Sequence, residues 1–278
     1  MINSLKFEFK NCINSREARL AIILMMTLTL SASLLSCITF YGFHITQVRS
    51  AMEMSFAIGN YSGTFMNAFE MLLPIIAGFI YSSSLLEEKE SSGLNYILIR
   101  TTYFSHVSVK GIILFIVTFL VISIPLILNA LICLTAFPIL SYDSTWAIPP
   151  YAYTILGNSG DYWLDSFEAV SPYAYEFVKI AIISLTGAVL AVFSYSLSFV
   201  SSIAKKNKYM NTLITFAVYT LITIVAGVSY LRVFSLASYV GDGYKGRGGV
   251  YLMIVGLLLL VSSSIIIYKG MHHYEDIC

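Results

Sequence analysis

The chain alternates long apolar stretches with short polar ones, and this pattern predicts its architecture. Six apolar stretches reach the roughly 20 residues that a helix needs to cross the hydrocarbon of a bilayer. We therefore expect an all-α polytopic membrane protein with six transmembrane helices, organised as a single transmembrane domain over residues 1–278. The predicted spans are residues 19–43, 63–86, 109–137, 174–203, 210–231 and 250–269.

The first 18 residues predict a separate helix. Leu5, Phe9 and Ile13 repeat every four residues among basic ones, a pattern typical of a helix that lies flat at the lipid headgroups. A frayed basic tail is the alternative.

The polar segment after the second span carries a further signal. Four consecutive charged residues, 87–90, cannot lie in hydrocarbon, so they mark the point where the chain leaves the bilayer. Leu94, Ile97 and Leu98 then share one helical face, which predicts a short amphipathic helix. Lys110 follows at the foot of the third span. An ordinary solvated connector is the alternative, since charge runs usually mark solvated segments.

This segment resembles the loop between the second and third spans of ABC-2 type exporter permeases. In that family a Glu-x-Glu-x-Gly-Thr-like run precedes a Leu/Ile-rich turn, a Pro-x-Ser-Arg turn and a lysine that heads the third span. The residues at comparable positions here are Glu88, Glu90, Gly93, Leu94, Ile97, Leu98 and Lys110. The glycine comes one residue late, and residues 101–105 stand in place of the proline turn.

The resemblance implies that this loop is a cytosolic coupling helix that docks on an ATP-hydrolysing subunit, and that the N-terminal helix is an elbow helix. The residues assigned to ATPase coupling are Glu87, Glu88, Glu90, Gly93, Leu94, Ile97, Leu98, Arg100 and Lys110. The chain has no Gly-x-x-x-x-Gly-Lys-Ser/Thr loop. We therefore expect ATP and Mg²⁺ on the partner subunit, no cofactor in this chain and no enzymatic activity of its own.

Polar residues and prolines inside the spans are candidates for a cargo path: Glu70, Pro74, Pro125, Asn129 and Lys179. An ionisable group in a membrane segment is a functional hypothesis by default, and Glu70 could pair with Lys179. Alternatively, Glu70 lies at the interface and reaches water. The prolines free backbone carbonyls that a watery cavity could accept, although prolines also serve in ordinary packing.

The cysteines and histidines show no metal-ligand spacing, so no metal site is expected. Cys37 and Cys133 would both lie toward the outer ends of their helices, where a disulfide is conceivable. Buried free thiols are the interpretation that we favour, because free cysteine behaves as a small hydrophobic residue.

The basic residues predict the orientation. With both termini in the cytosol, eleven of the 16 lysines and arginines lie in inner segments, as the positive-inside rule requires. The net charge is only +1, so electrostatics gives no case for a nucleic-acid partner.

Together these features predict the membrane subunit of a bacterial ABC exporter, a multi-pass protein of the cytoplasmic membrane. It would pair with a second copy or a related permease, contact membrane lipid, and bind two ATPase subunits. The nearly uncharged spans favour an amphipathic or apolar cargo, such as a bacteriocin or another peptide toxin, over a charged glycan. The alternatives are an integral membrane enzyme acting on lipid or peptide, and an ion-coupled carrier.

Overall fold

A computed structural model describes residues 2–44, 48, 50–58, 63–81, 84–90, 102–139, 164, 171–200, 209–228, 231–241 and 247–272. Every element in this part of the chain is a helix. The helices are α1 (Ile2–Asn14), α2 (Arg16–Thr39), α3 (Ala51–Met54), α4 (Gly63–Phe79), α5 (Ser84–Glu90), α7 (Tyr103–Ala136), α10 (Pro172–Val200), α11 (Met210–Val228), η3 (Arg232–Phe234), α12 (Ala237–Val240) and α13 (Gly248–His272).

Five of the described helices are long and apolar enough to cross a membrane: α2, α7, α10, α11 and α13. The prediction of an all-helical, multi-pass membrane protein is confirmed to this extent. The helices correspond to the first, third, fourth, fifth and sixth predicted spans, with ends that differ by a few residues. For example, α7 begins at Tyr103, six residues before the predicted span, and the extended residue Thr102 precedes its first turn.

The second predicted span is shorter than expected. α4 has 17 residues, or about 26 Å at a rise of 1.5 Å per residue, and it ends at Phe79. Tyr81 has a φ of 55°, in the left-handed region that a helix does not tolerate, so the chain turns there and starts α5 at Ser84. The prediction of one continuous helix to residue 86 is therefore wrong, and a sixth crossing stays a prediction.

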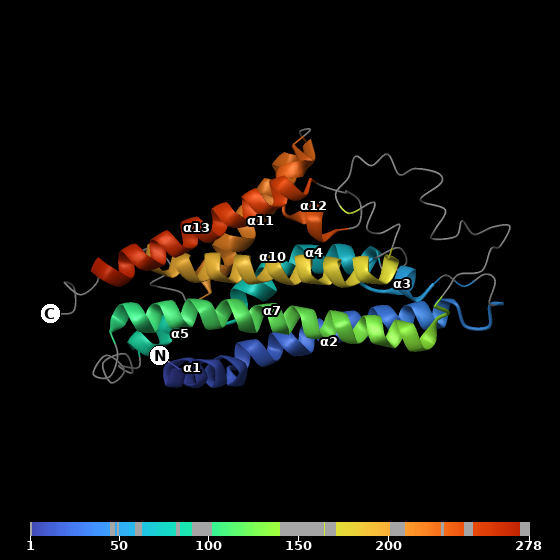
Figure 1. Ribbon diagram of the computed structural model, residues 1–278, viewed down its shortest axis with the longest axis horizontal. Coiled ribbons are helices and arrows are strands. Elements are labelled where there is room, and N and C mark those ends of the chain that lie inside the picture. The colour runs from blue at the N-terminus through green and yellow to red at the C-terminus, as the bar shows by residue number, and fades with distance from the viewer. Residues whose placement is uncertain are drawn as a thin grey trace.

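The centre of the molecule is the pair α7 and α10, which lie side by side in Figure 1. α1 and α2 pack on α7, whereas α4, α11 and α13 pack on α10. Gly187 permits the close approach of the central pair, because a Cβ at this position would overlap the Ile122 side chain.

Asn129 on α7 joins three parts of the fold through its buried amide. Its Nδ2 donates to the Thr29 carbonyl (2.9 Å) and to Ser33 Oγ (2.6 Å), both on α2. Its Oδ1 accepts from the backbone N–H of Phe56, at 2.8 Å. Hydrogen bonds of this kind hold helices together in lipid, where apolar surfaces are not driven together by water.

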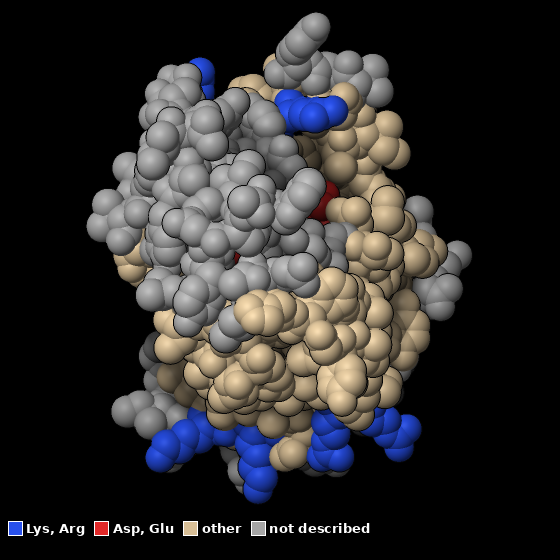
Figure 2. Space-filling view, turned by 90° about the vertical axis from the view of Figure 1, so that its right-hand side faces the viewer, with Lys and Arg blue, Asp and Glu red and all other residues tan. Residues whose placement is uncertain are grey.

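The start of α1, the short helix α5, the start of α7 and the end of α13 lie at one end of the bundle (Figure 1). Figure 2 views the opposite end and shows basic side chains along the lower edge, the side on which α1 lies in Figure 1. The exposed basic residues of α1 and the start of α2 are Lys6, Lys10, Arg16 and Arg19. The amphipathic helix predicted at the N-terminus is thus a helix with a basic outer face, and its elbow role stays a prediction.

Candidate functional site

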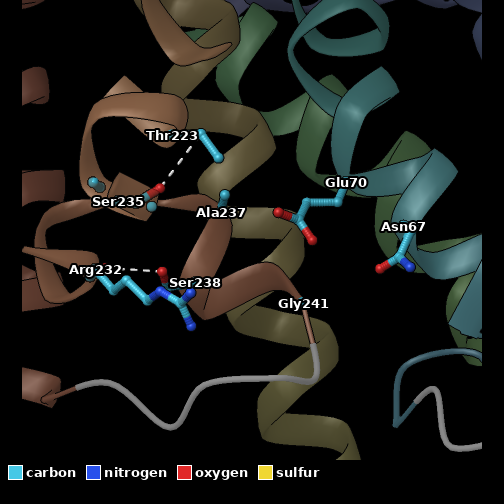
Figure 3. Close-up of a pocket in the computed structure, with 10 residues that line it drawn as sticks. Asn67, Glu70, Thr223, Arg232, Ser235, Ala237, Ser238 and Gly241 are labelled. Carbon is cyan, nitrogen blue, oxygen red and sulfur yellow. Dashed lines mark hydrogen bonds between the residues drawn. The ribbon is translucent and has the colours of Figure 1, made fainter. Parts of the chain in front are cut away.

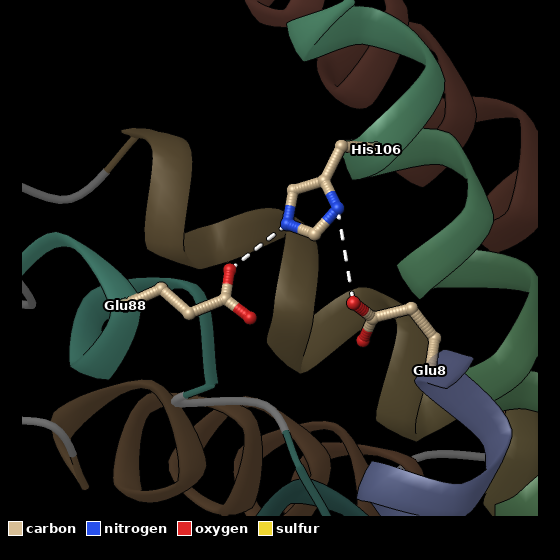
Figure 4. Close-up of side chains that lie close together, drawn as sticks. All are labelled: Glu8, Glu88 and His106. Atoms are coloured by element: carbon tan, nitrogen blue, oxygen red, sulfur yellow. Dashed lines mark hydrogen bonds and ion pairs between the residues drawn. The ribbon is translucent and has the colours of Figure 1, made fainter. Parts of the chain in front are cut away.

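A buried cluster of charged side chains joins α1, α5 and α7. Lys110 Nζ lies 2.6 Å from Glu88 Oε1, and His106 Nε2 lies 2.9 Å from Glu88 Oε2. On the other side of the imidazole ring, Nδ1 lies 3.8 Å from Glu8 Oε1 (Figure 4). We call Glu8, Glu88, His106 and Lys110 the charged cluster.

The helices position these four residues in a simple way. His106 and Lys110 are four residues apart on α7, so they project from the same face. Glu8 reaches them from α1, which packs along the first turns of α7. Glu88 comes from α5, which points toward α7 because the chain turns at Tyr81.

Polar neighbours complete the cluster. The Tyr81 hydroxyl donates to Glu8 Oε2 at 2.8 Å, and Lys110 Nζ donates to Ser84 Oγ at 3.3 Å. The Lys110 ammonium also lies 5.2 Å from the centroid of the Tyr81 ring, within the range of a cation–π contact. The turn between α4 and α5 and the first residue of α5 therefore provide hydrogen-bond partners for both Glu8 and Lys110.

Three of the four charged side chains in the cluster are buried. Glu8 and Lys110 are each 1% exposed and His106 is 5% exposed, so each charge needs a partner in place of water. Burial by itself would raise the pKa of Glu88, but the hydrogen bond from His106 and the charge of Lys110 outweigh it and lower the pKa below 4.5. Glu88 is accordingly an ionised acceptor, and His106 carries a proton on Nε2.

The cluster joins three helices. Glu88 on α5 contacts both His106 and Lys110 on α7, and Glu8 on α1 lies on the other side of the His106 ring.

Glu8, Glu88 and His106 also offer ligand atoms that lie within 4.8 Å of one another, and Zn²⁺ accepts these donors. However, the two carboxylates lie at different nitrogens of one ring, and Lys110 already neutralises Glu88 (Figure 4). A metal ion would have to displace the ammonium. The geometry thus fits an ion-pair network better than a metal centre.

The structure brings together two of the residues predicted for coupling, Glu88 and Lys110, in direct contact. Glu87 is partly exposed on α5, and Glu90 is the last residue of this helix. Gly93, Leu94, Ile97, Leu98 and Arg100 lie outside the described residues, so the predicted coupling helix stays a prediction.

Sequence reasoning missed Glu8, Tyr81 and His106. His106 stands one turn before Lys110, and Glu8 is the acidic residue among the basic ones of α1. These signals become meaningful only when α1 is known to pack on α7, which hydropathy does not indicate.

At the other end of the bundle, Glu70 lines a polar cavity of about 290 Å³ formed by α4, α11 and the segment from Arg232 to Gly241. Figure 3 shows the Glu70 carboxylate directed toward this segment. Hydroxyl groups of Thr223, Ser235 and Ser238 also line the cavity.

The other residues predicted for the cargo path are not part of the polar cavity wall. Pro74, Pro125 and Asn129 are buried within the bundle, and Lys179 is 8% exposed on α10. The Glu70–Lys179 pair stays a prediction. Cys37 and Cys133 are free thiols, as we expected, with Cys133 buried and Cys37 partly exposed.

Comparisons of this chain with protein-family models, with curated proteins and with solved structures find no match.

Proposed function

We propose that this chain is the membrane-spanning subunit of an ATP-driven ABC exporter, and that the charged cluster transmits force from an ATPase subunit to the spans. The observation that carries the proposal is the direct contact between Glu88 on α5 and Lys110 on α7. α5 is the described segment that leads into the predicted coupling helix, so a push on this helix would reach α7 through the cluster.

α7 is suited to pass on such a movement. It packs on α10, α2, α1 and α13, so a tilt of α7 shifts most of the bundle. In this proposal, closure of the ATPase subunits tilts α7 and α4 against each other and opens a path toward the outside, a form of alternating access. The bundle end with α1, α5 and the end of α13 then faces the cytosol, in a bacterial cytoplasmic membrane.

The test is docking of the ATPase. The chain is purified from the membranes of its own cells, and an ATPase subunit that purifies with it is identified by mass spectrometry. The double variant Glu90→Ala, Gly93→Pro should stay folded in the membrane but lose the ATPase, whereas the control Arg247→Ala at the other end should retain it. If the double variant retains the ATPase as the wild type does, or if no ATPase purifies with the wild type, the proposal is wrong.

The cargo that we favour is an amphipathic or apolar molecule, and within this class a peptide. Stimulation of the assembled complex's ATPase activity by amphipathic peptides, and not by sugars, would support this choice. Stimulation by sugars alone would overturn it.

A proton-coupled carrier is the second candidate, because the charged cluster holds a buried histidine between two carboxylates. Proteoliposomes that contain this chain alone distinguish the two functions. Uptake driven by a pH gradient without ATP, and abolished by His106→Gln, would favour the carrier over the exporter.

A further inference from the structure

One face of α1 packs on the helix bundle. Leu5 and Phe9, two residues of the apolar stripe that the sequence assigned to the lipid headgroups, pack against the hydrophobic core. Cys12 is fully buried in this core, and Glu8 on the same face is 1% exposed and belongs to the charged cluster. The side of α1 that meets the membrane is therefore the opposite one.

This opposite face of α1 is basic. Lys6 and Lys10 are four residues apart, so they project from one side of the helix, and both are exposed. Phe7 and Ile13 are 58% and 37% exposed on the same helix. Lysines beside exposed apolar side chains suit the headgroup region of a bilayer, where the ammonium reaches phosphate and the apolar groups enter the acyl boundary.

The basic face continues into the first turn of α2. Ser15 fixes the corner between the two helices, since its Oγ donates to the Cys12 carbonyl at 2.8 Å and accepts from the Ala18 N–H at 3.2 Å. Arg16 and Arg19 come directly after this corner and are exposed. Four exposed cations thus belong to one surface, which we call the basic corner: Lys6, Lys10, Arg16 and Arg19.

The basic corner lies where α2 begins to face lipid. Leu20 and Ile23 follow Arg16 by four and seven residues, so the three side chains share one face of α2. The two apolar residues are 56% and 59% exposed. At a rise of 1.5 Å per residue, Leu20 lies about 6 Å beyond Arg16 along the helix. A lipid whose acyl chains contact these apolar side chains therefore has its headgroup beside the basic corner.

The basic corner keeps most of its positive charge. Its four cations form no ion pair in the described part of the chain, and Arg19 donates to the Asn14 side chain at 3.2 Å. α1 and α2 contain two acidic residues, Glu8 in the charged cluster and Glu17, which is partly exposed. Basic side chains accordingly gather along the lower edge of Figure 2, the side on which α1 lies in Figure 1.

We propose that the basic corner binds the phosphate of an anionic phospholipid such as phosphatidylglycerol. Lysine and arginine donate charge-assisted hydrogen bonds to phosphate oxygens, and a cluster of four such residues beside a spanning helix attracts anionic lipid. The apolar face of α2 next to Arg16 favours a lipid over an acidic protein segment, because a lipid supplies both the anion and the acyl chains. The inference needs no ATPase and no cargo, so its failure would leave the proposed function untouched.

The test uses the full chain in phosphatidylcholine nanodiscs that contain a small fraction of phosphatidylglycerol with a photoreactive diazirine close to its headgroup. We expect crosslinks concentrated on α1 and the first turns of α2, as mapped by mass spectrometry. Raising the salt from about 0.1 M to 1 M shortens the Debye length from about 10 Å to about 3 Å and should weaken this labelling.

Substitutions in the basic corner separate binding from ordinary contact with the bilayer. Lys10→Gln and Arg16→Gln should each lower the labelling about fivefold, the effect of one basic residue near a charged membrane surface. The exposed Arg232→Gln and Arg247→Gln at the other end of the bundle are matched controls and should leave it unchanged. Glu17→Gln should raise the labelling, an outcome that misfolding would not produce.

Competition identifies the ligand. Unlabelled phosphatidylglycerol should compete, whereas added phosphatidylcholine and soluble glycerol 3-phosphate should not compete at equal concentration. Labelling spread evenly over α2, α11 and α13, or unchanged in both basic-corner variants, would overturn the proposal. Equal competition by glycerol 3-phosphate would overturn the assignment to a lipid, and displacement by polyglutamate but not by phosphatidylglycerol would assign the surface to an acidic protein instead.

Discussion

Lys110 Nζ on α7 lies 2.6 Å from Glu88 Oε1 on α5, and the lysine is 1% exposed. This pair joins a spanning helix to the short helix that precedes the predicted coupling segment. If the carboxylate is removed, the buried ammonium keeps its charge without a partner. The loss of stability is therefore greater than that from breaking an ion pair on the surface.

Glu88→Gln should therefore destabilise the protein by about 3 kcal/mol, because Lys110 would be left buried without a negative partner. Thermal unfolding in detergent measures the effect. Glu87→Gln is the control, since this residue precedes Glu88 on α5 and is partly exposed. The double variant Glu88→Gln, Lys110→Met should recover part of the loss, and equal stability of all these variants would contradict the buried pair.

The same pair predicts a dependence on pH. The pKa of Glu88 is lower in the folded protein than its ordinary value of 4.5, so its contribution to stability is complete above pH 4.5. It is lost as the pH falls through the lowered pKa. The Tm of the wild type should drop more steeply below pH 4.5 than the Tm of Glu88→Gln, and parallel curves would contradict the prediction.

Asn129→Leu should cost about 2 kcal/mol, because three hydrogen bonds between α7, α2 and the Phe56 backbone are lost together. The exposed Asn67→Leu is a matched control. Unfolding of both variants in the same detergent is the measurement. A loss at Asn129 no larger than that at Asn67 would show that the buried amide is not a structural node.

Gly187→Ala should destabilise by about 1–3 kcal/mol, because the new Cβ overlaps Ile122 where α7 and α10 meet. Ile122→Val in the same chain should relieve part of the cost. By contrast, Gly256→Ala on α13 has no atom within 4 Å of the new Cβ and should be neutral or slightly stabilising. Equal effects at the two glycines would contradict the close approach of the central helices.

Cys12 should resist alkylation in the folded protein. Burial, together with the nearby Glu8 charge, raises the pKa of the Cys12 thiol from 9.0 to about 12, and so lowers its thiolate fraction at pH 8 about 1,000-fold. Mass spectrometry of maleimide adducts measures the rate. Cys12 should react at an ordinary rate only after unfolding, and fast labelling in the native protein would contradict the packing of α1 on α7.

The sequence predicted the spanning helices well, because about 20 apolar residues have few other stable arrangements in water or lipid. It predicted the end of α4 poorly, since the break depends on one left-handed residue, Tyr81, that no local pattern distinguishes. It identified Glu88 and Lys110 by their place beside the spans. It could not identify Glu8 as their neighbour, because the packing of α1 brings together residues about 80 or more positions apart along the chain.

The turn at Tyr81 has a mechanical consequence. Two helices joined by a bend do not behave as one stiff rod, so torque applied to α5 is poorly conveyed along the axis of α4. The Tyr81 hydroxyl connects the turn to α1 by its hydrogen bond to Glu8, and the ion pair of Glu88 with Lys110 connects α5 to α7. A force applied to α5 is therefore transmitted to α1 and α7 through these contacts. α4 moves less, because only the turn at Tyr81 connects it to α5.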